Sequence, residues 1–142
     1  MHPRVRAERL RELAESASQE LALRGKSRRF VRILKEAASL GDREAMLELG
    51  VRLTEGKIVP RDPAAAVVWF RKAARKGSAR AHSMLGLCFE SGTGVRLSLR
   101  RAFRWYSLAA QGGNEDAETA LGRCYFYGRG VARDYGMAFR VW

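Results

Sequence analysis

Residues 78–113 read SARAHSMLGLCFESGTGVRLSLRRAFRWYSLAAQGG, and their key positions recur along the chain at a spacing of 36 residues. The recurring features are an alanine, a leucine–glycine pair and an aromatic pair: Ala45, Ala81 and Ala117; Leu49-Gly50, Leu85-Gly86 and Leu121-Gly122; Trp69-Phe70 and Trp105-Tyr106. Such a period marks an array of small units, each of which buries its apolar face only against its neighbours. The sequence therefore predicts a solenoid rather than a globule with one central core.

Each unit contains two helix starts, and both are marked by residues that cap helices. At the first helix start, the capping residue directly follows a glycine; these residues are Asp42, Ser78 and Asn114. At the second helix start, no glycine precedes the capping residue; these residues are Asp62, Ser98 and Asp134. Side-chain oxygens of these residues accept hydrogen bonds from first-turn amides, and the glycine suits a left-handed end of the preceding helix. We predict an all-α fold with first helices over 43–54, 79–90 and 115–126. The second helices are expected over 63–76, over 99–112 and from 135 onward.

The predicted organisation is one repeat domain over residues 1–142. Its repeats cover residues 42–77, 78–113 and 114–142, and the third stops within its second helix. Residues 1–41 are expected to form an atypical capping helix pair, 4–23 and 27–40, with Ser27 as the second cap. The side chains expected to face inward are Leu10, Leu13, Ala14, Ala17 and Leu21, then Phe30, Ile33, Leu34, Ala37 and Ala38.

The repeated glycine after each leucine predicts close packing between the two helices of a repeat. Glycine inside a helix costs about 1 kcal/mol relative to alanine, so three equivalent glycines indicate a shared packing need. The facing residues are expected to be the small Ala66, Ala102 and Ala138, with the aromatic residues filling wider gaps in the core. Between the helices, short glycine turns are expected, and Ile58 replaces the second turn glycine of the first repeat, which predicts a different backbone path there.

With these positions in view, the chain resembles the Sel-one-like repeat family, a relative of the tetratricopeptide repeats. Residues 81–113 match the family pattern closely, and residues 45–77 match it except around Ile58. Ser98 stands where the family usually has aspartate, and serine also caps helices. The resemblance implies a right-handed α/α superhelix that serves as an adaptor or scaffold for other proteins. It does not identify the partner.

Tetratricopeptide geometry, transferred through the leucine–glycine register, implies a concave face made by the first helices of the repeats. The leading hypothesis is that this face binds a partner protein or peptide. The residues implied are Glu44, Leu47, Glu48 and Val51; Arg80, Ser83, Leu87 and Glu90; and Asp116, Thr119, Arg123 and Phe126. The alternative is that the same positions form a solvent-exposed face without a partner.

The net charge of +12 is the second functional signal. Much of it lies on the second helices, at positions off the apolar stripe, and predicts a basic convex ridge: Arg71, Lys72, Arg75, Lys76, Arg100, Arg101 and Arg104. Such a ridge attracts nucleic acid, an anionic surface or an acidic protein, although a merely solvated helix face explains it too. No aromatic residue is expected between the exposed charges, so stacking of bases has no evident platform.

No motif for catalysis, a cofactor or a metal is evident, and we expect a non-enzymatic protein. Cys88 and Cys124 occupy equivalent places on adjacent helices, about 8–10 Å apart and beyond disulfide reach, so two free, buried thiols are expected. His2 and His82 have no partners for nucleophilic catalysis. The charged N-terminal sequence does not resemble a secretory signal and no stretch has transmembrane length, so a cytoplasmic location is expected.

The third repeat ends at Trp142, the position of Phe70 and Tyr106 in the earlier repeats. We expect Leu121, Tyr125 and Phe139 to be partly exposed beside it. Either the chain belongs to a longer array, or this end associates with another copy or a partner.

Overall fold

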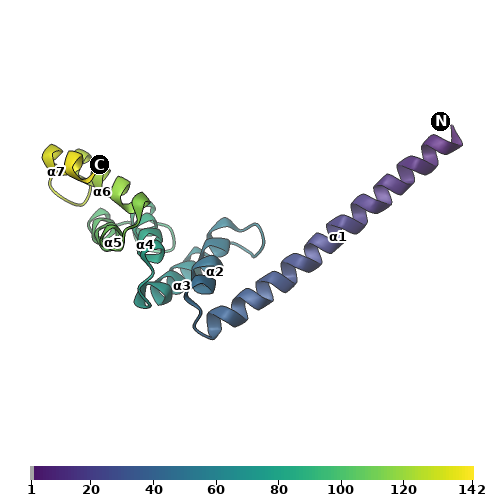
Figure 1. Cartoon of the computed structure of the whole chain (residues 1–142), viewed down its shortest axis with the longest axis horizontal. Helices are drawn as coiled ribbons and strands as arrows, with labels where there is room; N and C mark the ends of the chain where they lie inside the picture. The colour runs from purple at the N-terminus through teal and green to yellow at the C-terminus, as the bar shows by residue number, and fades with distance from the viewer. Residues whose placement is uncertain (1) are drawn as a thin grey trace.

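The computed structural model describes residues 2–142, except the side chains of Leu10, Ala14, Ala17, Ser18, Glu20, Leu21 and Ala22. This described part is all α-helical: α1 (Pro3–Ser39), α2 (Arg43–Glu55), α3 (Pro63–Arg75), α4 (Ala79–Ser91), α5 (Leu99–Gln111), α6 (Glu115–Tyr127) and α7 (Tyr135–Val141). Each helix packs against its neighbours along the chain, and α2 to α7 stack in order (Figure 1). The predicted all-α solenoid of helix pairs is confirmed.

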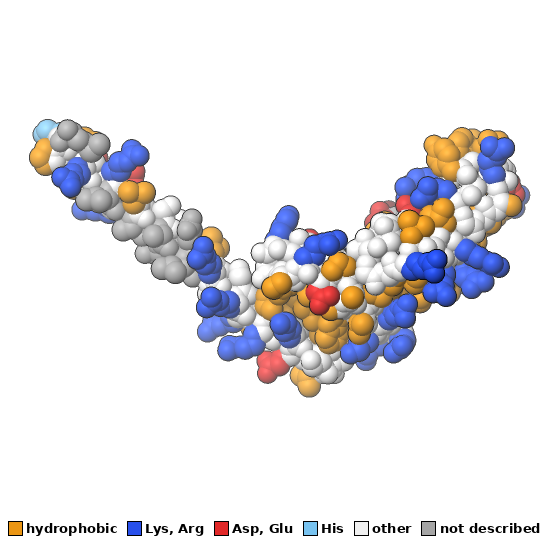
Figure 2. Space-filling model, turned by 180° about the vertical axis from the view of Figure 1, so that it is seen from behind, with side chains coloured by type: hydrophobic (Ala, Val, Ile, Leu, Met, Phe, Trp, Pro, Cys, Tyr) orange, Lys and Arg blue, Asp and Glu red, His pale blue; other side chains and the backbone are white. Residues whose placement is uncertain are grey.

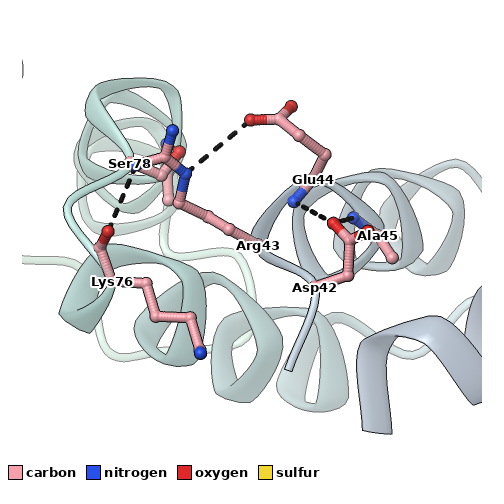
Figure 3. Close-up of polar contacts among 7 residues, drawn as sticks. Asp42, Arg43, Glu44, Ala45, Lys76 and Ser78 are labelled. Carbon is pink, nitrogen blue, oxygen red and sulfur yellow. Dashed lines mark hydrogen bonds and ion pairs between the residues drawn. The ribbon is translucent and has the colours of Figure 1, made fainter. Parts of the chain in front are cut away.

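The helix boundaries follow the predicted caps. At the start of α2, the Asp42 carboxylate accepts hydrogen bonds from the backbone amides of Glu44 and Ala45, at 3.0 and 3.2 Å (Figure 3). All six predicted residues cap their helices in this way, and the glycines at 41, 77 and 113 adopt positive φ angles. The Arg43 guanidinium also donates to the carbonyl oxygen of Lys76 at 3.2 Å, which ties the start of α2 to the end of α3.

The glycine of each leucine–glycine pair lies under an aromatic ring from the second helix of its repeat. A Cβ added at Gly50 would lie 2.5 Å from the Phe70 ring, and one added at Gly86 would lie 2.6 Å from Tyr106. Trp142 covers Gly122 in the same way. The predicted close approach of the two helices of a repeat is confirmed. The aromatic ring, and not the facing alanine, occupies the space above the glycine.

The core is formed by aliphatic, small and aromatic residues along the stack. Phe70 and Tyr106 are almost fully buried, as the sequence predicts. Cys88 and Cys124 are buried and free, which confirms the expected pair of thiols. Burial raises the pKa of both thiols, so they remain protonated and unreactive at neutral pH.

The prediction of a capping helix pair over residues 4–23 and 27–40 is wrong, because α1 is one continuous helix. Ser27 does not cap a second helix; its hydroxyl donates to the Leu23 carbonyl oxygen at 2.9 Å, one turn back within α1. Gly25 has open space around it and does not break the helix. No proline interrupts this segment and residues 23–26 are exposed, so the intrahelical hydrogen bonds continue.

Only the last turns of α1 pack against the repeats, while the rest projects away from them (Figure 1). Leu34 and Ala38 are buried as predicted, and Ala37 is partly buried against the same core. Leu13, Phe30 and Ile33 are exposed, so the prediction that they face inward is wrong. The predicted inward side chains of Leu10, Ala14, Ala17 and Leu21 lie outside the described residues.

The turn of the first repeat differs from the other two, as Ile58 predicts. Gly94 and Gly130 have φ angles of 71° and 76°, and each lies against the first residue of the preceding repeat's second helix, Pro63 or Leu99. The element before the first repeat is the continuous α1, which has no helix start at that place. Ile58 instead lies beside α1, where it lines a hollow with Val31 and Lys35. The continuous helix thus explains why this turn has no second glycine.

Aromatic side chains gather at the C-terminal end of the stack. The Phe126 ring lies within 4.9 Å of both Tyr127 and Tyr135, and stacks on Trp142 at 5.8 Å, between ring centroids. Phe139 and Trp142 are exposed, by 66% and 53%. Tyr125 is partly buried, as expected, but the prediction for Leu121 is wrong because its side chain is only 8% exposed.

Candidate binding surfaces

The residues implied for a concave face divide into three groups by exposure. The exposed residues are Glu44, Arg80, Leu87, Asp116, Thr119 and Arg123, and the partly buried ones are Glu48, Val51, Glu90 and Phe126. Leu47 and Ser83 are buried, with exposures of 2% and 6%, so these two side chains do not present themselves to a partner. Leu47 belongs to the core cluster that also contains Leu34 of α1 and Leu85 of α4, so neighbouring helices cover it.

An ion pair joins two members of this set across adjacent repeats. Glu90 on α4 lies 3.9 Å from Arg123 on α6, and both line a hollow of about 490 Å³ with Tyr127 and Arg129. Beneath it, the buried Tyr106 hydroxyl has no hydrogen-bond partner among the described residues. Burial, followed by the negative charge of Glu90, raises the pKa of Tyr106 well above its ordinary value. The hollow is therefore lined by one carboxylate, two guanidinium groups and the Tyr127 side chain.

The seven residues predicted for the basic ridge are all exposed. None of them forms an ion pair with a described side chain; the four described pairs involve Arg43, Arg52 and Arg123. Figure 2 shows Lys and Arg side chains along the repeats with hydrophobic side chains between them. The described surface therefore keeps much of the net positive charge free of carboxylates.

Four of the ridge residues line a groove between α3, α4 and α5, with a volume of about 580 Å³. Its lining is Arg71, Ala74 and Arg75 from α3, His82 and Phe89 from α4, and Arg101, Arg104, Trp105 and Leu108 from α5. The expectation that no aromatic residue lies between the exposed charges is therefore wrong. The α5 residues follow the spacing i, i+3, i+4 and i+7, which places them on one helix face. That spacing in the sequence indicates a shared helix face, whereas the charges alone indicate only a ridge.

The aromatic part of the groove is already internally paired. The His82 ring stacks on the Trp105 indole, with centroids 5.7 Å apart and planes inclined by 24°. Burial lowers the pKa of His82, against a smaller raising effect of a backbone hydrogen bond with Ala74. His82 is therefore neutral at pH 7, and the positive charge of the groove comes from its arginines. The Arg101 guanidinium lies over the Phe89 ring at 5.8 Å.

The part of the chain that the structure describes shows neither a membrane span nor a metal-binding cluster. No helix there is both long and apolar enough to cross a membrane. No group of three histidine, cysteine, aspartate or glutamate residues there is arranged to hold a metal ion. The basic groove and the hollow at Glu90 are thus the features that binding hypotheses must address.

Solved structures similar to this chain include two repeat proteins that are about a third identical to it over the matched region. A protective antigen present in uropathogenic Escherichia coli strains, displaying an SLR fold, is 34% identical with a TM-score of 0.77; the match covers 94% of this chain and 31% of that one. A Sel1 repeat protein from Oxalobacter formigenes is 33% identical with a TM-score of 0.75; the match covers 78% of this chain and 32% of that one. This chain thus spans about a third of the length of both.

A more distant structure supports the fold alone. Cysteine rich protein B of Helicobacter pylori is 20% identical with a TM-score of 0.64, and the match covers 83% of this chain and 84% of that one. No curated protein sequence matches the chain.

The sequence model of the Sel1 repeat matches three segments, residues 43–78, 79–114 and 115–140. Each match begins one residue after a predicted repeat start, at the first residue of α2, α4 or α6. Sel1 repeats are typically non-catalytic scaffolds for protein–protein interaction. With most of its length in three matched repeats and a helical stack like those of solved relatives, this chain belongs to the Sel1 repeat family.

Proposed function

We propose that the chain is a non-enzymatic scaffold that binds another protein or peptide on a concave face formed by α2, α4 and α6. The observation that carries the proposal is Leu87, an apolar side chain 46% exposed on the middle helix of this set. Glu90 lies one turn further along α4 and pairs with Arg123. An exposed apolar side chain beside such polar groups matches the apolar contacts and polar rim of protein interfaces.

The test is affinity capture with identification of bound proteins, comparing wild type with Leu87→Asp and Arg123→Glu. We expect both variants to lose the same partner, because one removes an apolar contact and the other reverses an orienting charge. Leu97→Asp and Lys57→Glu are matched controls, since both residues are exposed in turns outside the proposed face. Unchanged recovery by Leu87→Asp and Arg123→Glu would refute the concave-face assignment.

A second candidate function is electrostatic binding of nucleic acid or an anionic surface by the basic ridge. It is supported by the seven exposed basic side chains without carboxylate partners among the described residues. Its affinity would fall steeply with salt and with charge reversal on the ridge, while Leu87→Asp would have no effect. Mobility shifts with RNA and DNA, and sedimentation with anionic vesicles, test it at low ionic strength; no binding in any of them disposes of the idea.

Self-association is a further proposal for the C-terminal aromatic side chains. Phe139 and Trp142 are exposed beside Phe126, and together they present a contiguous apolar surface. A second copy that covers this surface would remove apolar area from water.

A further inference from the structure

The groove between α3 and α5 is flanked by arginines from two successive repeats. Arg71 and Arg75 lie one turn apart on α3, and Arg101 and Arg104 lie one turn apart on α5. Because α3 and α5 are the second helices of neighbouring repeats, the stacking of the repeats creates this arrangement. One pair of guanidinium groups on α3 and another pair on α5 thus line the same groove.

The arginines have no carboxylate to satisfy them. No described acidic residue lines the groove, and none of the four arginines forms an ion pair with a described carboxylate. A guanidinium presents donors in a planar fork that matches a carboxylate with two parallel hydrogen bonds. The charge complement of the groove is therefore a ligand with several separated negative groups.

The lining between the arginines favours an aliphatic or aromatic side chain over a nucleic-acid base. A base requires an open aromatic face for stacking, whereas His82 stacks on the Trp105 indole and Trp105 packs against the core on α4 and α5. The rest of the lining includes Ala74 and Leu108, and Leu108 is 45% exposed. The volume of about 580 Å³ lies in the range of ligand pockets, and is sufficient for one large side chain and its flanking residues.

From this combination we infer that the groove is a docking site for an acidic segment of a partner protein. One apolar side chain of the segment lies over Ala74, Trp105 and Leu108, while flanking aspartates and glutamates bind the arginines on either side. The inference rests on the proposed scaffold role and names a second surface and its partner chemistry. It does not depend on the concave face, because the groove uses other helix faces.

Selection of random displayed peptides on the immobilised full chain tests the specificity. We expect the recovered peptides to be enriched in aspartate and glutamate around one large apolar residue. A recovered peptide, labelled with a fluorophore, is then titrated with each protein variant and its anisotropy is measured. Recovery of no peptides, or of peptides without an acidic bias, would overturn the inference.

Matched charge reversals separate the groove from the net charge. Arg101→Glu combined with Arg104→Glu should weaken peptide binding by at least about tenfold, because both guanidinium groups then repel the peptide. Lys72→Glu combined with Arg100→Glu makes the same change in net charge. These two residues lie on α3 and α5, which flank the groove, at exposed positions that do not line it. This control should weaken binding by less than about threefold. Equal losses in the two double variants would show attraction to overall charge and overturn the groove assignment.

Further variants separate the groove from the concave face and from nucleic-acid binding. Leu108→Ser should weaken binding of the selected peptide, and Leu97→Ser in a turn should not. Leu87→Asp should leave the affinity for the selected peptide unchanged. If Leu87→Asp were the only variant that weakened peptide binding, the peptide would bind the concave face and the groove assignment would be refuted. A single-stranded DNA oligonucleotide is tested as a competitor. If it displaces the peptide and its affinity is higher than that of the peptide, these arginines bind nucleic acid instead. Thermal unfolding of each variant confirms that the fold is retained.

Discussion

The ring of Tyr106 lies directly against Gly86, so that a Cβ at position 86 would fall 2.6 Å from ring carbons of Tyr106. Phe70 makes the same contact with Gly50 in the preceding repeat. This relationship locks the two helices of a repeat together and explains why the leucine–glycine pair recurs.

Gly86→Ala should therefore destabilise the protein, by about 1–3 kcal/mol, because an overpacked ring must shift. Alanine alone would favour the helix by about 1 kcal/mol, so steric overlap must exceed that gain. Gly25→Ala is the matched control, because Gly25 lies inside α1 with nothing within 4 Å of the added methyl group. We expect Gly25→Ala to be neutral or stabilising in denaturant unfolding. If Gly86→Ala were equally harmless, the aromatic contact would not explain the glycine.

The turns of the repeats give a second prediction, since only two of them need a second glycine. Gly94 has a φ angle of 71° and lies against the Pro63 carbonyl group, so Gly94→Ala adds both backbone strain and a clash. We expect a loss of about 1–3 kcal/mol in the free energy of unfolding. Ile58→Gly at the equivalent place should cost less, because it removes only a side chain that is 37% exposed. A larger loss for Ile58→Gly would mean that its contact with α1 matters more than the turn geometry.

The Tyr106 hydroxyl supplies a third prediction, because it is buried without a hydrogen-bond partner among the described residues. Tyr106→Phe should leave the stability unchanged or raise it by up to about 1 kcal/mol, since a desolvated polar group is removed. Phenylalanine already occupies the equivalent position 70. The measurement is urea unfolding at neutral pH. A loss of more than about 1 kcal/mol would show that the hydroxyl donates to Glu90 in solution.

The stability should also depend on pH through His82. Burial lowers its pKa in the folded protein below the ordinary value of 6.5, so the unfolded chain binds this proton more readily. The stabilisation of the folded protein that comes from this pKa difference is fully present above pH 6.5. It is lost as the pH falls through the pKa of His82 in the folded protein. Melting curves between pH 7.5 and 5.5 should show a smaller decrease for His82→Gln than for wild type. Identical pH dependence would mean that His82 titrates in the same way in both states.

Local signals explain why the helix boundaries were predictable from the sequence. A capping residue such as Asp42 and a glycine such as Gly77 act within a few residues, and their chemistry can be read without knowledge of the fold. The same reasoning failed at Ser27, because a serine inside a helix bonds to the preceding turn as readily as it caps a new one. Only packing decides between the two, and the neighbouring residues 23–26 and 28–30 of α1 are all exposed.

The binding surfaces were less predictable because they depend on how repeats stack. Leu47 shares a register position with Ser83 and Thr119, yet the first two are buried and Thr119 is exposed. The charges in the sequence predict the basic ridge, but the groove requires Arg71 of one repeat to lie near Arg104 of the next. The helical spacing of Arg101, Arg104 and Leu108 indicates a shared face, although it does not show what lies opposite.

The aromatic C-terminal surface gives the last prediction. Phe126, Phe139 and Trp142 contact one another, and Phe139 is 66% exposed. Burial of apolar surface contributes about 25 cal/mol per Å², so covering this surface with a second copy favours association. Light scattering over a concentration series should show an average mass that rises with concentration, and a dye for apolar surfaces should bind.

Phe139→Ser should weaken this association without unfolding the chain, because its ring is mostly solvated in the monomer. Leu40→Ser is the matched control: Leu40 is 87% exposed at the other end of the repeats and should not affect the average mass. Trp142 is unsuitable for this comparison, because it covers Gly122 and its indole nitrogen donates to the Thr119 carbonyl oxygen at 3.2 Å. A strictly monomeric wild type that binds no dye would refute association through these aromatic side chains.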